Sequence, residues 1–225
     1  MSRKITFTNT LDYDLEQPKS ASKWVPEWYS TMESYKNNKK IANSFGTGLG
    51  TIKKCMPVFD AITAGYIIVT PVDLYIGPDG TMSWPSANFI TFHEEWQAPD
   101  HPLYNGRLYP KFNNPWIIKT PKGYSSLFVQ PFHRKSIFTI MPGIVDTDTY
   151  FGLINFPFVL NDLSFTGIVP KGTPIVQVIP FKRENWESKA GTEKDKEQSM
   201  QQQKEARSTF YDYYKRMWHR KKQYK

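Results

Sequence analysis

Short apolar runs, several of them alternating with polar residues, recur through the middle of the chain. Turn-forming Gly, Pro, Asn and Asp residues separate these runs, which is typical of strands joined by tight turns. About ten short strands follow one another at spacings of roughly 8–12 residues, a pattern that indicates an all-β sandwich or barrel. The clearest runs are Gly65–Val69, Val72–Ile76, Trp116–Thr120, Tyr124–Gln130, Ser136–Met141 and Ile175–Ile179. We therefore predict a mainly β domain over residues 51–187.

Other segments of the same region carry weaker signals. Lys4–Thr8 alternates between apolar and polar residues and predicts one strand near the start of the chain. Thr51–Met56 predicts a strand edge, and Pro57–Thr63 predicts a turn or one short helical piece. Met82–Phe92 predicts a single strand.

Residues 1–50 beyond the first strand predict an extended arm and a loop. Two tryptophans alternate with prolines between Pro18 and Trp28, which favours an extended segment that buries its rings on a core. The run Ser44–Gly50 contains three glycines but lacks the Gly-Lys-Ser/Thr ending of a phosphate-binding loop. We interpret it as a flexible or hairpin loop.

Residues 188–225 predict a linker followed by a basic helix. From Glu193 onward there is no Pro or Gly, and Phe210, Tyr214, Met217 and Trp218 have helical spacing. We expect one amphipathic helix whose aromatic stripe packs on its own domain, on a neighbouring subunit or on another protein. Most of the net charge of +8 also lies near this end. Nucleic acid is therefore a minor alternative partner.

Composition limits the class of protein. A single cysteine, Cys55, excludes a disulfide within the chain. No apolar run approaches the length needed to span a membrane, and the first residues lack the apolar core of a signal peptide. We expect a soluble protein of a reducing compartment, with no membrane partner, that is not secreted.

The segment Gly143–Gly152 carries a recognisable motif. Its sequence, GIVDTDTYFG, resembles the third motif of the trimeric dUTPase family, with one extra residue, Thr149. The resemblance implies that Asp146 meets the deoxyribose and the activating water, and that Tyr150 packs under the sugar. Asp and Thr also favour turns through local hydrogen bonds. A turn without catalysis is therefore an equal alternative for this segment.

Two further segments extend the resemblance. Gly172–Ile179 is similar to the fourth motif, which implies phosphate binding by Gln177; a buried Gln in an apolar strand also needs hydrogen-bonding partners. The sequence Tyr-Ser-Ser-Leu beginning at Tyr124 is similar to the second motif, which implies phosphate binding by Ser125 and Ser126. Tyr124 replaces the Arg of that motif, so its charge is missing there.

Other parts of the family pattern are altered. Ala64-Gly65-Tyr66 resembles the first motif, but Ile67 replaces the Asp through which that family holds its metal. The glycine-rich fifth motif is absent, and so is the Glu that dCTP deaminases need after the third motif. The resemblance therefore supports the fold, a β-clip of the dUTPase and dCTP deaminase type, better than the reaction. It also implies a homo-oligomer, a trimer in that family.

The chain as a whole resembles an uncharacterised family of β-rich proteins of bacteria and tailed phages. The shared features are the Trp-Pro arm, Lys54–Pro57, Asn114–Trp116, Pro121–Ser125, the motif at Val145–Tyr150 and Pro180–Glu184. This resemblance implies a phage-encoded protein, cytoplasmic or associated with the virion. It brings no activity with it.

Three functions remain open. The first is a non-catalytic binding or structural module on a dUTPase-like scaffold, without a cofactor. The second is an Mg-dependent, dUTPase-like pyrophosphatase, with Asp146 and Tyr150 as catalytic residues and Ser125, Ser126 and Gln177 around the phosphates. A minor third is a non-haem iron enzyme using His93, Glu95 and His133. We favour the first, because attack on a triphosphate needs the phosphate charge neutralised. In this chain the Arg of the second motif and the Asp of the first motif are both replaced.

Overall fold

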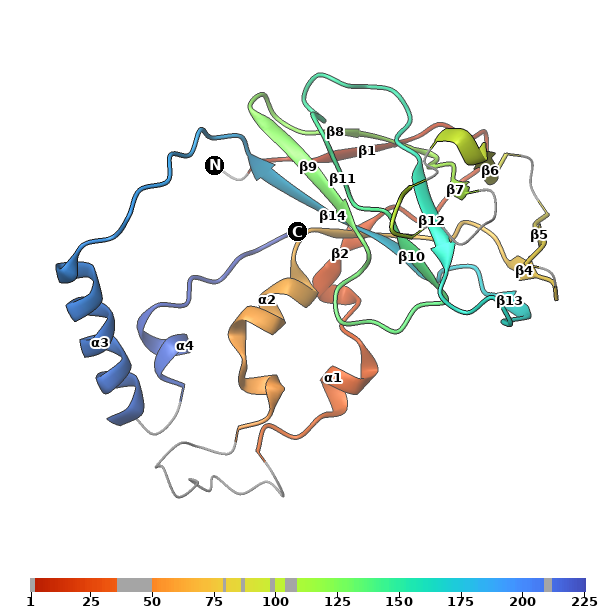
Figure 1. Ribbon diagram of the computed structural model, residues 1–225. Coiled ribbons are helices and arrows are strands. Elements are labelled where there is room, and N and C mark those ends of the chain that lie inside the picture. The colour runs from red at the N-terminus through yellow and green to blue at the C-terminus, as the bar shows by residue number, and fades with distance from the viewer. Residues whose placement is uncertain are drawn as a thin grey trace. The chain divides into compact units, whose positions relative to one another are not determined.

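The computed structural model describes residues 3–35, 50–78, 80–85, 88–97, 100–103, 109–208 and 212–225. The chain forms two compact units (Figure 1). The sheet unit comprises Met1–Trp24, Ala64–Arg183 and Tyr224–Lys225, and the helical unit comprises Val25–Thr63 and Glu184–Gln223. The predicted glycine-containing loop lies outside the described residues except for Gly50.

Antiparallel strands make up the sheet unit, as the alternating pattern predicts. In the described part of the chain they form sheets with the orders β11-β9-β14-β3-β2, β10-β12-β7-β6, β13-β4-β5 and β1-β8. The strands are β1 Thr6–Asn9, β2 Lys19–Ser20, β3 Tyr66–Val69, β4 Leu74–Ile76, β5 Met82–Ser83, β6 Ile90–His93, β7 Tyr109–Phe112, β8 Trp116–Lys119, β9 Tyr124–Val129, β10 Phe138–Ile140, β11 Gly143–Val145, β12 Phe156–Leu160, β13 Gly167–Val169 and β14 Pro174–Lys182. The short 3-10 helices are Ala21–Lys23 and Glu95–Gln97. The predicted mainly β fold is confirmed.

Strand β14 is central to the largest sheet. It pairs with β3 on one side and with β9 on the other. The register places Gln177 between Ile67 and Val129. At the other end of the strand, Lys182 lies opposite Tyr124. This register brings the residue after β14, Arg183, to the start of β9.

The core of the sheet unit is aromatic. Phe112, Phe138, Phe156 and Phe158 are all buried. The rings of Phe112 and Phe158 stack with centroids 4.1 Å apart, and Phe138 meets Phe112 edge-on at 5.1 Å. Such ring pairs add about 0.5–1.5 kcal/mol each beyond the area they bury. These rings come from β7, β10 and β12, which are neighbouring strands of one sheet.

Gly65 allows a close approach between β3 and β14. Its φ is +68°, and a side-chain carbon at this position would overlap the carbonyl oxygen of Val178. Only glycine combines this backbone angle with the space available. The Ala-Gly-Tyr segment beginning at Ala64 therefore has a structural reason for its glycine.

The helical unit contains α1 Glu27–Thr31, α2 Met56–Thr63, α3 Glu193–Ser208, α4 Tyr213–Met217 and the 3-10 helix η3 Ile52–Lys54. Its two chain segments are joined by two lysine ion pairs and by a histidine contact. Lys54 Nζ lies 2.7 Å from Asp212 Oδ1. His219 Nε2 lies 3.0 Å from Asp60 Oδ1, and Lys222 also pairs with Asp60. Throughout the described ranges, no helix is long and apolar enough to cross a membrane.

Two predicted strands are wrong. Thr51–Met56 contains η3 instead, because the N–H groups of Lys54 and Cys55 turn back to the carbonyls of Thr51 and Ile52. Met82–Phe92 is split into β5 and β6. Pro85 in the gap has no N–H to donate to a sheet, and Asn88 has a φ of +63°. Both features interrupt a strand that the apolar pattern alone makes continuous.

The C-terminal helix is present, but the prediction of one continuous helix is wrong. Helices α3 and α4 are separate elements. Asp212, immediately before α4, has a left-handed backbone with φ +59°, which does not continue a right-handed helix. Of the predicted aromatic stripe, Tyr214, Met217 and Trp218 are between 38% and 54% exposed, and Phe210 lies outside the described residues.

Candidate functional site

The acidic turn after β11 is built by its own backbone. The N–H of Thr147 donates to the Val145 carbonyl at 2.9 Å, and the N–H of Tyr150 donates to the Asp146 carbonyl at 2.9 Å. This tight arrangement sends two neighbouring acids into different surroundings. The Asp146 side chain is 59% exposed, whereas that of Asp148 is 1% exposed.

Asp148 is held by an arginine from the far end of β14. Its Oδ1 accepts from Arg183 Nη1 at 2.9 Å, and its Oδ2 accepts from Arg183 Nη2 at 2.6 Å. The same Oδ2 accepts the backbone N–H of Gly123 at 2.7 Å. A two-pronged pair of this kind fixes both direction and distance. Arg183 therefore joins the end of β14 to the turn after β11.

This pairing changes the acidity of both groups. The hydrogen bonds from Arg183, and then from the Gly123 N–H, lower the pKa of Asp148 to about 2. The bond to Asp148 raises the pKa of Arg183 above its ordinary value. Both effects stabilise the charged forms. The pair thus stays ionised over the whole physiological pH range.

Ser125 and Asp146 complete the cluster around this arginine. Ser125 Oγ donates to Asp146 Oδ1 at 2.6 Å. Arg183 Nη1 lies 3.0 Å from Ser125 Oγ and 3.1 Å from Asp146 Oδ1. We call Ser125, Asp146, Asp148 and Arg183 the Arg183 cluster. It brings together two residues that the sequence singled out, Ser125 and Asp146.

Arg183 itself was not predicted as a site residue. Sequence comparison placed it only in the segment Pro180–Glu184, while the missing charge was noted at Tyr124. The structure shows that Arg183 Nη1 also donates to the Tyr124 carbonyl at 3.1 Å. A guanidinium therefore lies beside the Tyr-Ser-Ser segment, although it comes from another strand. The pairing of β14 with β9 was the signal needed to find it.

Ser126 points to the other face of β9 from Ser125, into the core. It is fully buried, and its hydroxyl lies 2.9 Å from that of Thr147. The Thr147 hydroxyl in turn lies 2.8 Å from that of Thr120. These three hydroxyls form a buried chain that ties β9 to the acidic turn. Ser126 is thus buried and hydrogen-bonded to another side chain of the protein.

Gln177 is also buried and hydrogen-bonded inside the protein. Its Oε1 accepts the N–H of Phe132 at 3.0 Å, and its Nε2 donates to the Ala64 carbonyl at 2.6 Å. The expected need of a buried Gln for partners is thereby met. Six residues separate Gln177 from Arg183 along the chain, and a strand rises about 3.3 Å per residue. The two side chains therefore start about 20 Å apart.

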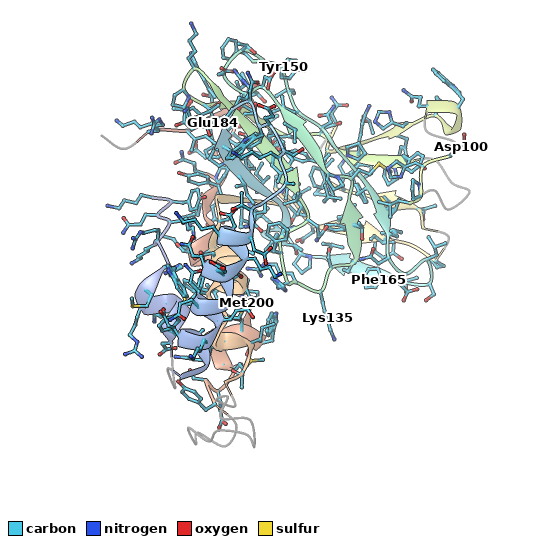
Figure 2. All side chains as sticks on the ribbon, turned by 60° about the vertical axis from the view of Figure 1, so that its left-hand side comes forward. Asp100, Lys135, Tyr150, Phe165, Glu184 and Met200 are labelled. Carbon is cyan, nitrogen blue, oxygen red and sulfur yellow. The ribbon has the colours of Figure 1, made fainter. Side chains whose placement is uncertain are left out.

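Tyr150 is at the periphery of the sheet unit, as Figure 2 shows. Its ring is 48% exposed, and its hydroxyl donates to the Leu153 carbonyl at 3.3 Å. Only its backbone N–H is bonded to Asp146. Exposed side chains of Ile144, Phe151 and Leu153 lie on the same segment.

The residues considered for iron show no assembled site. Among the residues that the structure describes, no group of three or more His, Cys, Asp or Glu side chains is placed to hold a metal ion. The Nδ1 atom of His93 lies 3.2 Å from Gln97 Oε1. The side chain of Glu95 is outside the described part. Nothing in the described geometry favours the iron hypothesis.

Comparison with known proteins gives a distant likeness. No protein-family model and no curated protein matches the sequence. A mutant dUTPase from phage phi11 of S. aureus matches with 14% identity and a TM-score of 0.34, covering 57% of this chain and 82% of that one. A mutant dUTPase of Staphylococcus bacteriophage 80alpha with dUpNHpp matches with 15% identity and a TM-score of 0.33, covering 57% and 75%. The chain is distantly similar to phage dUTPases.

Identity and TM-score are both low in these matches. They assign no activity, ligand or residue role to the present chain. The geometry of the Arg183 cluster and the burial of Ser126 and Gln177 are independent of that comparison.

Proposed function

We propose that this chain is a non-catalytic binding or structural module on a dUTPase-like β scaffold. One observation carries the proposal. The guanidinium of Arg183 is directed onto the acids of the turn after β11. Asp148 accepts hydrogen bonds from both of its Nη atoms, and Nη1 also bonds to Asp146 and Ser125. The Arg183 cluster is thus a clamp between β14 and the turn after β11.

Charge supports this interpretation. The Arg183 cluster contains two carboxylates and one guanidinium, so the groups bonded to each other carry a net negative charge. Attack on a triphosphate is accelerated by cations that meet the phosphate oxygens. A cation already paired with a buried carboxylate cannot turn to a phosphate without leaving that carboxylate unpaired, at high cost.

The same geometry argues against a magnesium site made by the acid pair. Mg²⁺ takes oxygen ligands in an octahedral arrangement, often one or two carboxylates with water and substrate phosphates. Both oxygens of Asp148 already accept hydrogen bonds, two from Arg183 and one from Gly123. A guanidinium between two carboxylates also repels a second cation. The residues present do not fit a metal shared by Asp146 and Asp148.

As a binding module, the chain has an exposed apolar surface next to the turn. Ile144, Tyr150, Phe151 and Leu153 are each between 46% and 65% exposed, and we call them the turn patch. Such a grouping on a surface favours contact with protein. We propose that the turn patch is where copies of this chain meet in a homo-oligomer. The exposed stripe of α4 is proposed as a contact for another protein.

A second candidate, the Mg-dependent pyrophosphatase, is favoured by one observation. Asp146 is 59% exposed, and its bonds within the described structure reach Oδ1. Oδ2 is therefore open to orient a water molecule. In this alternative Mg²⁺ is held mainly by substrate oxygens. Ser125, Ser126 and Gln177 as phosphate ligands and Tyr150 under the sugar remain predictions.

Turnover separates the two candidates. The purified protein is incubated with dUTP, dCTP, dATP, dGTP or dTTP and Mg²⁺, and pyrophosphate and ammonia are measured. We expect neither product above a protein-free blank. Turnover that disappears in Asp146→Asn but persists in Asp162→Asn would establish the enzyme instead. Asp162 is the matched control because it is another turn aspartate, bonded to Ser164.

A further inference from the structure

The sheet unit contains a cavity whose described lining includes no residue of the Arg183 cluster. Its volume is about 590 Å³, within the range of about 300–1,000 Å³ usual for small-molecule pockets. The described lining comes from the segment after β1, from β6, β7 and the residues that flank them, and from the segment before β12. Pro71, between β3 and β4, is also part of the lining, so segments that are far apart in sequence converge on this cavity.

Internal hydrogen bonds hold part of this wall in place. Asn113 Oδ1 accepts from Thr91 Oγ1 at 2.9 Å, and Asn113 Nδ2 donates to the Asn88 carbonyl at 2.6 Å. On the opposite side, both the N–H and the hydroxyl of Thr10 donate to the Pro115 carbonyl at 2.9 Å. The cavity is preformed, because its lining segments are tied to each other without a ligand.

Other lining groups have unused hydrogen-bonding capacity. They are the ammonium of Lys111, the side-chain amides of Asn88 and Asn155, and the hydroxyl of Tyr13. Within the described residues, no hydrogen bond or ion pair is formed by these side chains. One charge, that of Lys111, is thus available to a ligand, and no acidic residue is part of the described lining.

The remaining lining of the cavity is apolar. Phe89 is buried in its wall, and Leu11, Leu153 and the ring of Tyr13 are each partly exposed. A phenol ring with a free face stacks on planar heterocycles. A carboxamide presents a donor and an acceptor side by side, which complements the hydrogen-bonding edge of a nucleobase. An ammonium meets a phosphate as a point charge.

We propose that this cavity binds a planar heterocycle carrying one anionic group, the chemistry of a nucleoside monophosphate. Lys111 binds the phosphate, Asn155 and Asn88 bind the edge of the base, and Tyr13 stacks on its face. The proposal is independent of the proposed function, because none of these residues belongs to the Arg183 cluster.

Isothermal titration calorimetry tests the site with AMP, GMP, CMP and UMP, with the four matching nucleosides, and with inorganic phosphate. We expect at least one nucleotide to bind at one site, about tenfold or more tighter than its nucleoside, since a charge-assisted bond is lost with the phosphate. Lys111→Met should abolish this difference, and Asn155→Leu should weaken nucleotide and nucleoside alike. Lys111→Gln repeats the test if the Met variant does not fold.

Lys171→Met is the matched control, because Lys171 is an exposed lysine of the same unit outside the cavity lining. Its affinities should equal those of the wild type. Three results would overturn the proposal: no nucleotide binding at millimolar concentration, inorganic phosphate binding as tightly as the nucleotides, or nucleotide binding that Asp146→Asn removes and Lys111→Met leaves intact. The last result would place the nucleotide at the Arg183 cluster instead.

Discussion

The carboxylate of Asp148 and the guanidinium of Arg183 meet through two parallel hydrogen bonds of 2.9 and 2.6 Å, although 35 residues separate them in sequence. The carboxylate is buried, while the arginine is 38% exposed. This contact ties the turn after β11 to the end of the central strand of the largest sheet. Both residues therefore have a structural role that does not depend on any chemistry.

Acid should weaken the fold through this pair. The pKa of Asp148 in the folded chain is about 2, below its ordinary 3.8. The unfolded state therefore takes up the proton first as pH falls. The stability that the pair contributes is present above pH 3.8 and is lost as pH falls towards 2.

Urea unfolding of wild type and Arg183→Gln at several pH values measures this loss. The difference in their free energies of unfolding should be largest above pH 3.8 and should shrink towards pH 2. A difference that is constant across this range would contradict the assignment of the low pKa to the Arg183 pair.

Thr147→Val should destabilise the sheet unit by about 1–3 kcal/mol. The substitution keeps the shape of the side chain but leaves the buried hydroxyls of Thr120 and Ser126 without this partner. Thr149→Val, two residues along the same turn and exposed, is the control and should change stability by less than about 0.5 kcal/mol. Equal effects in the two variants, measured by urea unfolding, would show that the buried hydroxyl chain contributes little.

Gly65→Ala should cost about 2–5 kcal/mol, because a positive φ and an overlap with the Val178 carbonyl act together. Gly172→Ala has a similar φ of +85° but no atom within 4 Å of the added carbon. It should cost only about 1–2 kcal/mol. Thermal and urea unfolding of both variants separate the backbone effect from the steric one.

Gln177→Met should cost about 2–4 kcal/mol. Methionine fills a similar volume but leaves the Phe132 N–H and the Ala64 carbonyl without the bonds that Gln177 makes. Gln201→Met on the exposed face of α3 is the control and should change stability by less than about 0.5 kcal/mol. If the two variants unfold at the same urea concentration, the hydrogen bonds of the Gln177 side chain contribute little to the stability of the sheet unit.

The turn patch makes a prediction about assembly. Ile144→Glu should shift the molar mass measured by light scattering from an oligomer to a monomer, because it places a charge among apolar side chains at the proposed contact. Ile168→Glu, at a residue equally exposed but on β13, should leave the mass unchanged. A wild-type chain that is already monomeric at micromolar concentration would refute the homo-oligomer.

Much of this architecture follows from local sequence. Alternating apolar residues predict most strands, and the Asp-Thr-Asp run predicts the turn at Asp146. The need of Gln177 for partners also follows from its place in an apolar strand. Errors arise where a local backbone preference overrides the pattern, as at Asn88 in the predicted strand Met82–Phe92 and at Asp212 before α4.

The Arg183 cluster forms between segments that are far apart in sequence, so local sequence patterns do not predict it. Ser125 and Asp146 belong to recognisable motifs, but the partner that connects them comes from the end of β14. Knowing that Lys182 pairs with Tyr124 requires the register of two strands, and no periodicity within either strand specifies it. The sequence therefore singles out two members of the Arg183 cluster and misses Asp148 and Arg183, which form its two-pronged pair.

The chain leaves the sheet unit for the helical unit immediately after Arg183. The chain also passes between the units at 24–25, 63–64 and 223–224, so β14 carries the part of any pull that reaches it through Glu184. That strand is bonded on both sides, to β3 and β9, and its hydrogen bonds lie across the direction of pull. They share the load in shear and must break together, with the Asp148 pair as the first point of resistance. The strand is thus anchored on both sides against a pull along its length.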